Sequence, residues 1–193
     1  MKQESSQPAS QSATPPFDLL LKGGQVIDPK RGTTQLADVA IAGGRIAQVE
    51  RDISPAKAKK VLAVGGCYVT PGLIDMHVHV FPCGFDWSLG ADAHSFCSGV
   101  TTMVDAGSGG VANFLRFKES VVDKSKTRIL AYLNVVDEGM GGDWEQDVSR
   151  MVPEATAEMA KAHSSLIVGI KAAHYWTYKP WDAFHAPWDN VER

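Results

Sequence analysis

Two histidines that lie two positions apart are the residues of this chain best suited to chemistry. His77 and His79 belong to the run Leu73–Val80, in which polar residues recur at every second position after the turn signal Pro71-Gly72. Alternate side chains of a strand share one face, so we expect Asp75, His77 and His79 to point the same way. Two imidazoles at this spacing can hold one metal ion such as zinc. The other residues of the run are apolar, which predicts a strand buried on both sides and favours a metal site over two histidines on a solvated face.

A lysine at the end of a second apolar run is the next candidate. Lys171 follows Leu166–Ile170, a stretch in which an ammonium group would be costly to bury. Desolvation favours the neutral amine of a lysine, and a neutral amine can add carbon dioxide to give a carbamate. A carbamate is a carboxylate-like ligand that can bridge two metal ions. A lysine whose head group reaches the solvent is equally compatible with these residues alone.

Further polar residues come at the ends of the predicted strands, where the active sites of βα barrels lie. Asp105 either supports the site or faces a substrate, or it caps the helix that follows. The glycines of 106–110 let backbone N–H groups approach a substrate oxyanion, or they form a tight turn. His174 orients a substrate or lies on the surface. Asn134 and Asp137 are the remaining strand-end candidates.

The elements that must position these residues follow a strand, loop and helix rhythm from Leu73 onward. Repeated βα units predict a parallel sheet, and periodicity alone leaves open whether it closes into a barrel or forms a doubly wound sheet. The expected strands are 73–79, 100–105, 128–136 and 166–171, and the expected helices are 91–97, 113–123 and 153–162.

The part of the chain before these units has a different character. Residues 1–16 are rich in Ser, Gln and Pro without an apolar core, which predicts a flexible tail, or a processed secretory tail. Residues 17–71 consist of short β-rich runs and predict a small sandwich-like domain. Gly43-Gly44 is a hairpin signal, and Gly23-Gly24 is another. We therefore expect three parts, namely the tail 1–16, the β-rich domain 17–71 and the βα domain 72–193.

Five segments together resemble the start of an amidohydrolase-superfamily metallohydrolase, in the branch that holds deacetylases and dihydroorotase-like enzymes. They are FDLLLKGGQVIDP, ADVAIAGGRIAQV, PGLIDMHVHV, GVTTMVDAGSGG and LIVGIKAAHY, in this order. The resemblance implies an α/β fold with a partial TIM-like (β/α) barrel of about four of its eight strands, behind a sandwich-like domain.

The same resemblance implies a divalent metal site, most often of zinc, with one or two ions. His77, His79 and a carboxylated Lys171 would be its ligands, and Asp105 and His174 would lie beside the substrate. In the family two more histidines and a general acid/base aspartate come from later strands. The residue that transfers protons is therefore expected beyond Arg193, and no catalytic residue is assigned within the sequence.

The resemblance implies hydrolysis of an amide or ester bond of a small molecule by metal-activated water, as in deacetylases. Two alternatives stay open: a cyclic amidohydrolase of the dihydroorotase or hydantoinase kind, and a non-catalytic homologue or fragment that acts as an assembly or binding subunit. An open half barrel exposes sheet edges, so we expect a homo-oligomer.

Composition excludes several other classes of protein. The net charge of −3 and the absence of a Lys/Arg cluster argue against a nucleic-acid partner. No apolar run reaches about 18 residues, which argues against a membrane partner. Cys67, Cys83 and Cys97 contain no Cys-x-x-Cys pair, so we expect reduced thiols that act as small apolar fillers, and a cytoplasmic protein.

Overall fold

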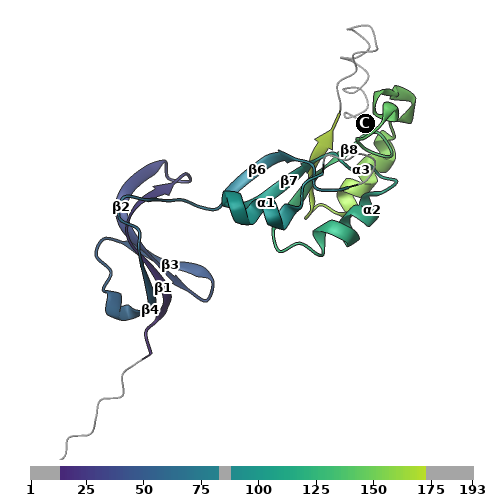
Figure 1. Ribbon diagram of the computed structural model, residues 1–193. Coiled ribbons are helices and arrows are strands. Elements are labelled where there is room, and N and C mark those ends of the chain that lie inside the picture. The colour runs from purple at the N-terminus through teal and green to yellow at the C-terminus, as the bar shows by residue number, and fades with distance from the viewer. Residues whose placement is uncertain (1–13, 83–87, 173–193) are drawn as a thin grey trace, which may run out of the picture. The chain divides into compact units, whose positions relative to one another are not determined.

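The computed structural model describes residues 14–82 and 88–172. The chain divides into two compact units between Pro71 and Gly72, and each unit contains one sheet among the described residues (Figure 1). His174, Cys83 and the aromatic residues that follow Lys171 in the sequence lie outside the described residues.

The first unit is a mixed sheet. In the strand order β3-β2-β1-β4, β2 is antiparallel to both β1 and β3, whereas β4 and the short β5 run parallel to β1. The expected sandwich-like unit is therefore built from strands of one sheet. Its elements are β1 (Phe17–Asp28), β2 (Thr33–Ala42), β3 (Arg45–Glu50), the 3-10 turn η1 (Pro55–Lys57), β4 (Ala58–Ala63) and β5 (Tyr68–Val69).

The two glycine pairs of this unit have different roles. Gly43-Gly44 connects β2 to β3 as predicted, and its positive φ values of 57° and 71° suit a two-residue hairpin turn. The predicted hairpin at Gly23-Gly24 is wrong, because β1 continues through it with a register shift between Leu21 and Gly24. The pair forms a bulge, and Gly24 lies so close to Val69 of β5 that a side chain would collide there.

The second unit is an α/β unit with a parallel sheet in the order β6-β7-β8-β9. This confirms the predicted fold class, and within residues 72–82 and 88–172 the sheet does not close into a barrel. The predicted helix 113–123 is divided into a short α-helix and a π-helical turn. The elements are β6 (Leu73–Val78), α1 (Ala91–Ser98), β7 (Val100–Ala106), α2 (Phe114–Phe117), η2 (Lys118–Val122), β8 (Arg128–Asn134), η3 (Asp143–Gln146), η4 (Val148–Arg150), α3 (Pro153–Ala162) and β9 (Ile167–Lys171).

The core of the second unit joins its sheet to all three α-helices. Met103 and Leu133 are fully buried, and side chains of α1, α2 and α3 pack on the same cluster. Phe81 and Phe117 meet with ring centroids 5.1 Å apart and are each at most 2% exposed. This aromatic pair packs the segment that follows β6 onto the core and so holds the strand end that carries the histidines in place.

β6 departs from its expected environment. We expected a strand buried on both sides, yet Leu73, Ile74 and Met76 are 52%, 61% and 62% exposed. The reason is that β6 lies at the edge of the described sheet and pairs only with β7 there. Self-association through such an edge stays a prediction.

Candidate metal centre

The two histidines lie side by side at the end of β6. Their ring centroids are 5.5 Å apart and the ring planes meet at 80°. Between them, Val78 is 4% exposed and belongs to the core cluster, so His77 and His79 share the opposite side. A bulge sets this arrangement, since the three-residue step from Asp75 to Val78 pairs with a two-residue step on β7. The carboxylate of Asp75 accepts a hydrogen bond from the His77 N–H at 3.1 Å.

Two buried polar residues stand behind His79. The Nδ1 atom of its ring lies 2.9 Å from Oγ of Ser108, which is 0% exposed. Asp105 is 1% exposed and accepts hydrogen bonds from the N–H groups of Val80 at 2.9 Å and Ser108 at 2.8 Å. The helix-capping alternative for Asp105 is thereby overturned, because its carboxylate binds the strand end and its own loop, well before α2 begins at Phe114.

Burial is the largest influence on the pKa of His79 and on that of Asp105. Burial lowers the pKa of His79 below its usual value, and the charges of His77 and Lys171 act in the same direction while Asp105 opposes them. Burial likewise raises the pKa of Asp105, against hydrogen bonds from Val80 and Ser108. A lowered pKa keeps the His79 imidazole neutral at pH 7, which is the form that binds a metal.

Lys171 reaches the same end of the sheet from β9. It pairs with Asn134 in the β8–β9 register, and its charge is near enough to influence His79. Gly107 packs directly on its stem, since a Cβ built on Gly107 would lie 2.6 Å from Lys171 Cβ. Asn134 is fully buried, and its Nδ2 donates to the Gly107 carbonyl at 3.1 Å. Together these contacts hold the lysine stem beside the loop that carries Ser108.

The glycine loop after β7 is a closely packed turn. Its Ser108 and Gly110 N–H groups donate to the side chains of Asp105 and Asn113, at 2.8 and 3.0 Å. A side chain at Gly110 would collide with the carbonyl groups of Val136 and Asp137. These bonds favour the tight-turn reading of the loop over an oxyanion role for these two N–H groups.

The structure thus gathers His77, His79, Asp105 and Lys171 at one end of the sheet, and His174 lies outside the described residues. Asp137 is instead committed to an ion pair with Arg150, at 2.9 Å. Sequence reasoning missed Ser108. A serine three residues after a strand-end aspartate, within a glycine turn, was the signal that could have found it.

The cysteines do not behave as expected. Cys67 and Cys97 are free thiols, and both are exposed. The prediction that they act as buried apolar fillers is therefore wrong for these two.

The donor set fits part of a metal site. Among residues 14–82 and 88–172, no group of three His, Cys, Asp or Glu side chains lies close enough to hold a metal ion. Two adjacent imidazoles and one lysine that can become a carbamate are nevertheless donors of the right chemistry, and a hydrogen-bond partner on the second ring nitrogen is typical of ligating histidines. In the same described ranges, no helix is both long and apolar enough to span a bilayer.

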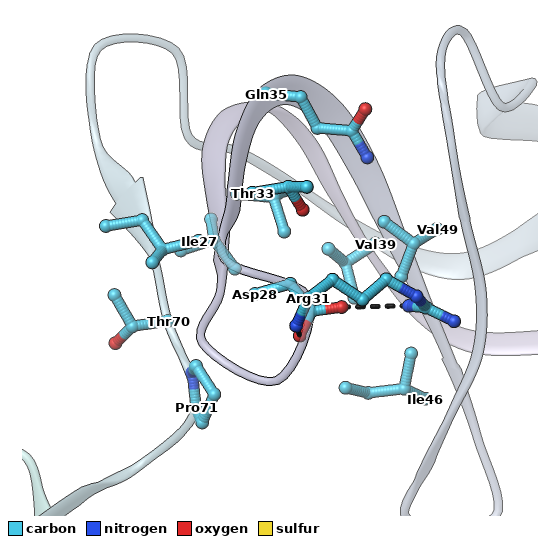
Figure 2. A pocket seen from close by; sticks show the side chains of 12 residues that line it. Ile27, Asp28, Arg31, Thr33, Gln35, Val39, Ile46, Val49, Thr70 and Pro71 are labelled. Carbon is cyan, nitrogen blue, oxygen red and sulfur yellow. Dashed lines mark hydrogen bonds and ion pairs between the residues drawn. The ribbon is translucent and has the colours of Figure 1, made fainter.

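A separate cavity lies in the first unit. It has a volume of about 330 Å³ and is lined mainly by β1, β2 and β3, with apolar residues such as Ile46 and Val49. Figure 2 shows the ion pair of Asp28 and Arg31, 2.8 Å long, among these side chains. None of the described candidates, His77, His79, Asp105 and Lys171, lines this cavity, so their chemistry belongs to the second unit.

A parallel α/β sheet that carries histidines and a lysine at its strand ends has the active-site placement of (β/α)-barrel enzymes. No protein-family profile matches the chain. A deacetylase of Agrobacterium fabrum is 33% identical over 168 residues, which cover 82% of this chain and 41% of the relative. A dihydroorotase of Syntrophotalea carbinolica is 48% identical over 69 residues, which cover 36% of this chain and 16% of the relative.

Solved structures agree with these relatives. An adenine deaminase superposes with a TM-score of 0.71 at 28% identity, over 91% of this chain and 48% of that protein. A dihydroorotase superposes with a TM-score of 0.65 at 31% identity, over 79% of this chain and 41% of that protein. The chain belongs to the amidohydrolase superfamily and corresponds to the N-terminal region of its members. It spans about two-fifths of the length of the matched deacetylase.

Proposed function

We propose that this chain contributes the first metal ligands of an amidohydrolase that removes acyl groups from small molecules. One observation carries the proposal: the adjacent rings of His77 and His79 lie at the end of a parallel sheet that also presents Lys171. The match to the Agrobacterium fabrum deacetylase supports the deacetylase class, because it covers 82% of the chain. The family to which the chain belongs supports metal-dependent hydrolysis.

Each residue has a separate task in this proposal. His77 and His79 bind a divalent ion, for which we propose zinc, through neutral imidazoles. The amine of Lys171, in its deprotonated form, attacks carbon dioxide, forms an N–C bond and releases one proton, and the resulting carbamate would be an anionic ligand beside the two imidazoles. A bound ion supplies a water molecule of lowered pKa and polarises the scissile carbonyl. The loop 107–110 excludes bulk water from behind the ligands, since its residues are buried.

The substrate class distinguishes the main proposal from its alternative. An N-acyl or O-acyl compound fits the deacetylase match, whereas a cyclic amide fits the dihydroorotase match over 69 residues. The same attack on a carbonyl carbon serves both. We favour the acyclic substrate because the sequence match to the deacetylase covers 82% of the chain, against 36% for the sequence match to the dihydroorotase. We place the proton-transferring aspartate outside this sequence.

Metal binding by the 193-residue chain tests the proposal. Equilibrium dialysis against Zn²⁺ should give bound metal in the wild type and a large loss in His77→Ala. His94→Ala is the matched control, because His94 is a partly buried histidine of the same unit on α1, away from the strand ends. Equal zinc binding by His77→Ala and the wild type would refute the ligand assignment.

The carbamate has its own signature. Protein incubated with ¹³C-bicarbonate should show a carbamate carbon resonance that is absent from Lys171→Ala, and Lys171→Glu should restore part of the metal binding by supplying a carboxylate. Hydrolysis of N-acetyl amino acids and of a cyclic amide, by a metal-loaded longer form that supplies the proton-transferring aspartate, then separates the two substrate classes. Metal binding by that form without turnover of either substrate would favour the non-catalytic alternative.

A further inference from the structure

A buried serine and a buried aspartate form a hydrogen-bonded chain behind His79. Ser108 Oγ lies 2.9 Å from His79 Nδ1, and the Ser108 side chain also interacts with the Asp105 carboxylate and opposes the rise of its pKa by burial. Ser108 is 0% exposed and Asp105 is 1% exposed, so water does not compete for either group. Polar groups buried to this degree need a reason, because each costs free energy unless it is fully hydrogen-bonded.

The number of hydrogens on each group shows which group donates and which accepts in the hydrogen bonds between His79, Ser108 and Asp105. A serine hydroxyl carries one hydrogen and can otherwise only accept. Asp105 accepts from the N–H groups of Val80 and Ser108, one on each carboxylate oxygen, and in its ionised form it has acceptor sites only. With Asp105 ionised, the hydroxyl hydrogen of Ser108 is directed to that carboxylate. Oγ then accepts from His79, whose proton must lie on Nδ1, and the lone pair of the ring lies on Nε2.

The same aspartate also fixes the backbone around the histidine. Val80 directly follows His79, and its N–H donates to Asp105 Oδ2 at 2.9 Å, while Ser108 N–H donates to Oδ1 at 2.8 Å. Val78, on the other side of His79, pairs with Asp105 in the β6–β7 register. One carboxylate thereby holds the strand that carries the ligand and the loop that carries the hydroxyl.

We infer that Ser108 and Asp105 are positioning residues that select the Nδ1–H tautomer of His79 and direct its Nε2 atom at the metal. The inference rests on the proposed function, in which His79 is a metal ligand. Ligating histidines commonly donate their second ring N–H to a carboxylate, a carbonyl or water, and removal of that partner costs about 10- to 100-fold in metal affinity. Here a serine hydroxyl is interposed between the ring and the carboxylate.

Metal titration of the 193-residue chain tests the inference. Ser108→Ala should bind Co²⁺ about 10- to 100-fold more weakly than the wild type in competition with a chromophoric chelator. Ser108→Thr keeps the hydroxyl and should restore most of the affinity. Ser95→Ala is the matched control, since Ser95 is a buried serine of the same unit whose hydroxyl binds the Val100 carbonyl, and its affinity should equal that of the wild type.

A second measurement needs no metal. Long-range ¹H–¹⁵N correlation spectra of metal-free protein report which ring nitrogen of His79 is protonated, with the signal assigned by its loss in His79→Gln. The wild type should show the Nδ1–H form, and Ser108→Ala should show a mixture. An Nε2–H form in the wild type, or unchanged Co²⁺ affinity in Ser108→Ala, would overturn the inference. Failure of the wild type to bind Co²⁺ would instead overturn the proposed function. The tautomer of His79 in the metal-free protein would still test the positioning role of Ser108 and Asp105.

Discussion

Replacing Gly107 with alanine tests whether Lys171 is held against the loop after β7. Gly107 has a φ of +83°, and an added Cβ would lie 2.6 Å from Lys171 Cβ and closer still to its Cγ. The Cβ atom of a strand residue cannot swing away, because it is attached directly to the backbone. The methyl group must therefore displace either the loop or the end of β9.

Two costs add up at this position. The left-handed backbone conformation costs a non-glycine residue about 1–2 kcal/mol. Crowding of a well-packed region by an extra methyl group costs about 1–3 kcal/mol more. Gly107→Ala should thus lower the free energy of unfolding by about 2–5 kcal/mol. Gly99→Ala is the control, since Gly99 has a φ of +73° with no atom within 4 Å of the added Cβ, and should lose only the backbone part.

Urea unfolding followed by tryptophan fluorescence measures the free energy of unfolding of the second unit, which contains both glycines. All five tryptophans of the chain follow residue 72 in the sequence, so the signal reports the second unit alone. The excess loss in Gly107→Ala over Gly99→Ala, about 1–3 kcal/mol, is the cost of crowding Lys171. Equal losses in the two variants would refute the close packing of Lys171 on this loop. Gly107→Ala should also bind Zn²⁺ more weakly than Gly99→Ala, because it displaces a proposed ligand.

Three further predictions concern the scaffold. Asp38→Ala should destabilise the first unit by about 2–3 kcal/mol, measured by hydrogen exchange of peptides from β1 and β2, because Lys22 and the N–H groups of Gly23 and Ile53 lose their acceptor. Burial alone would raise the pKa of Asp38, but these hydrogen bonds outweigh burial and the pKa lies below 3.8, so the stabilisation is complete above that pH and is lost as the pH falls through the lowered pKa. Gly24→Ala should cost about 1–3 kcal/mol in the same assay by collision with Val69, and an unchanged exchange rate would contradict the bulge packing. Asp92→Ala removes the acceptor for backbone N–H groups of the loop before β8 and should lower the urea midpoint of the second unit; an unchanged midpoint would show that this clamp does not contribute.

Much of the fold of the second unit could be predicted because its strands and helices are marked locally. Val100–Ala106 and Arg128–Asn134 are apolar runs bounded by turn residues, and Pro153 opens α3 where a missing N–H costs nothing. The expected hairpin at Gly23-Gly24 failed because two glycines mark a backbone that must deviate, without saying whether it turns or bulges. The pairing of β1 with β2, whose register shifts between Leu21 and Gly24, decides that question.

Some residues of the candidate site can be recognised from their own stretch of sequence, whereas others depend on how distant strands pair. His77, His79 and Lys171 could be selected because each is a polar residue in an apolar strand, which is costly without a function. The bulge in β6 that turns Asp75 back to its own strand could not, since it depends on the register with β7. Ser108 looked like an ordinary turn serine, because nothing local shows that its hydroxyl is fully buried against another strand. The ligands of a metal site can thus be proposed from strand patterns, whereas the groups that orient them become visible only once the strands are paired.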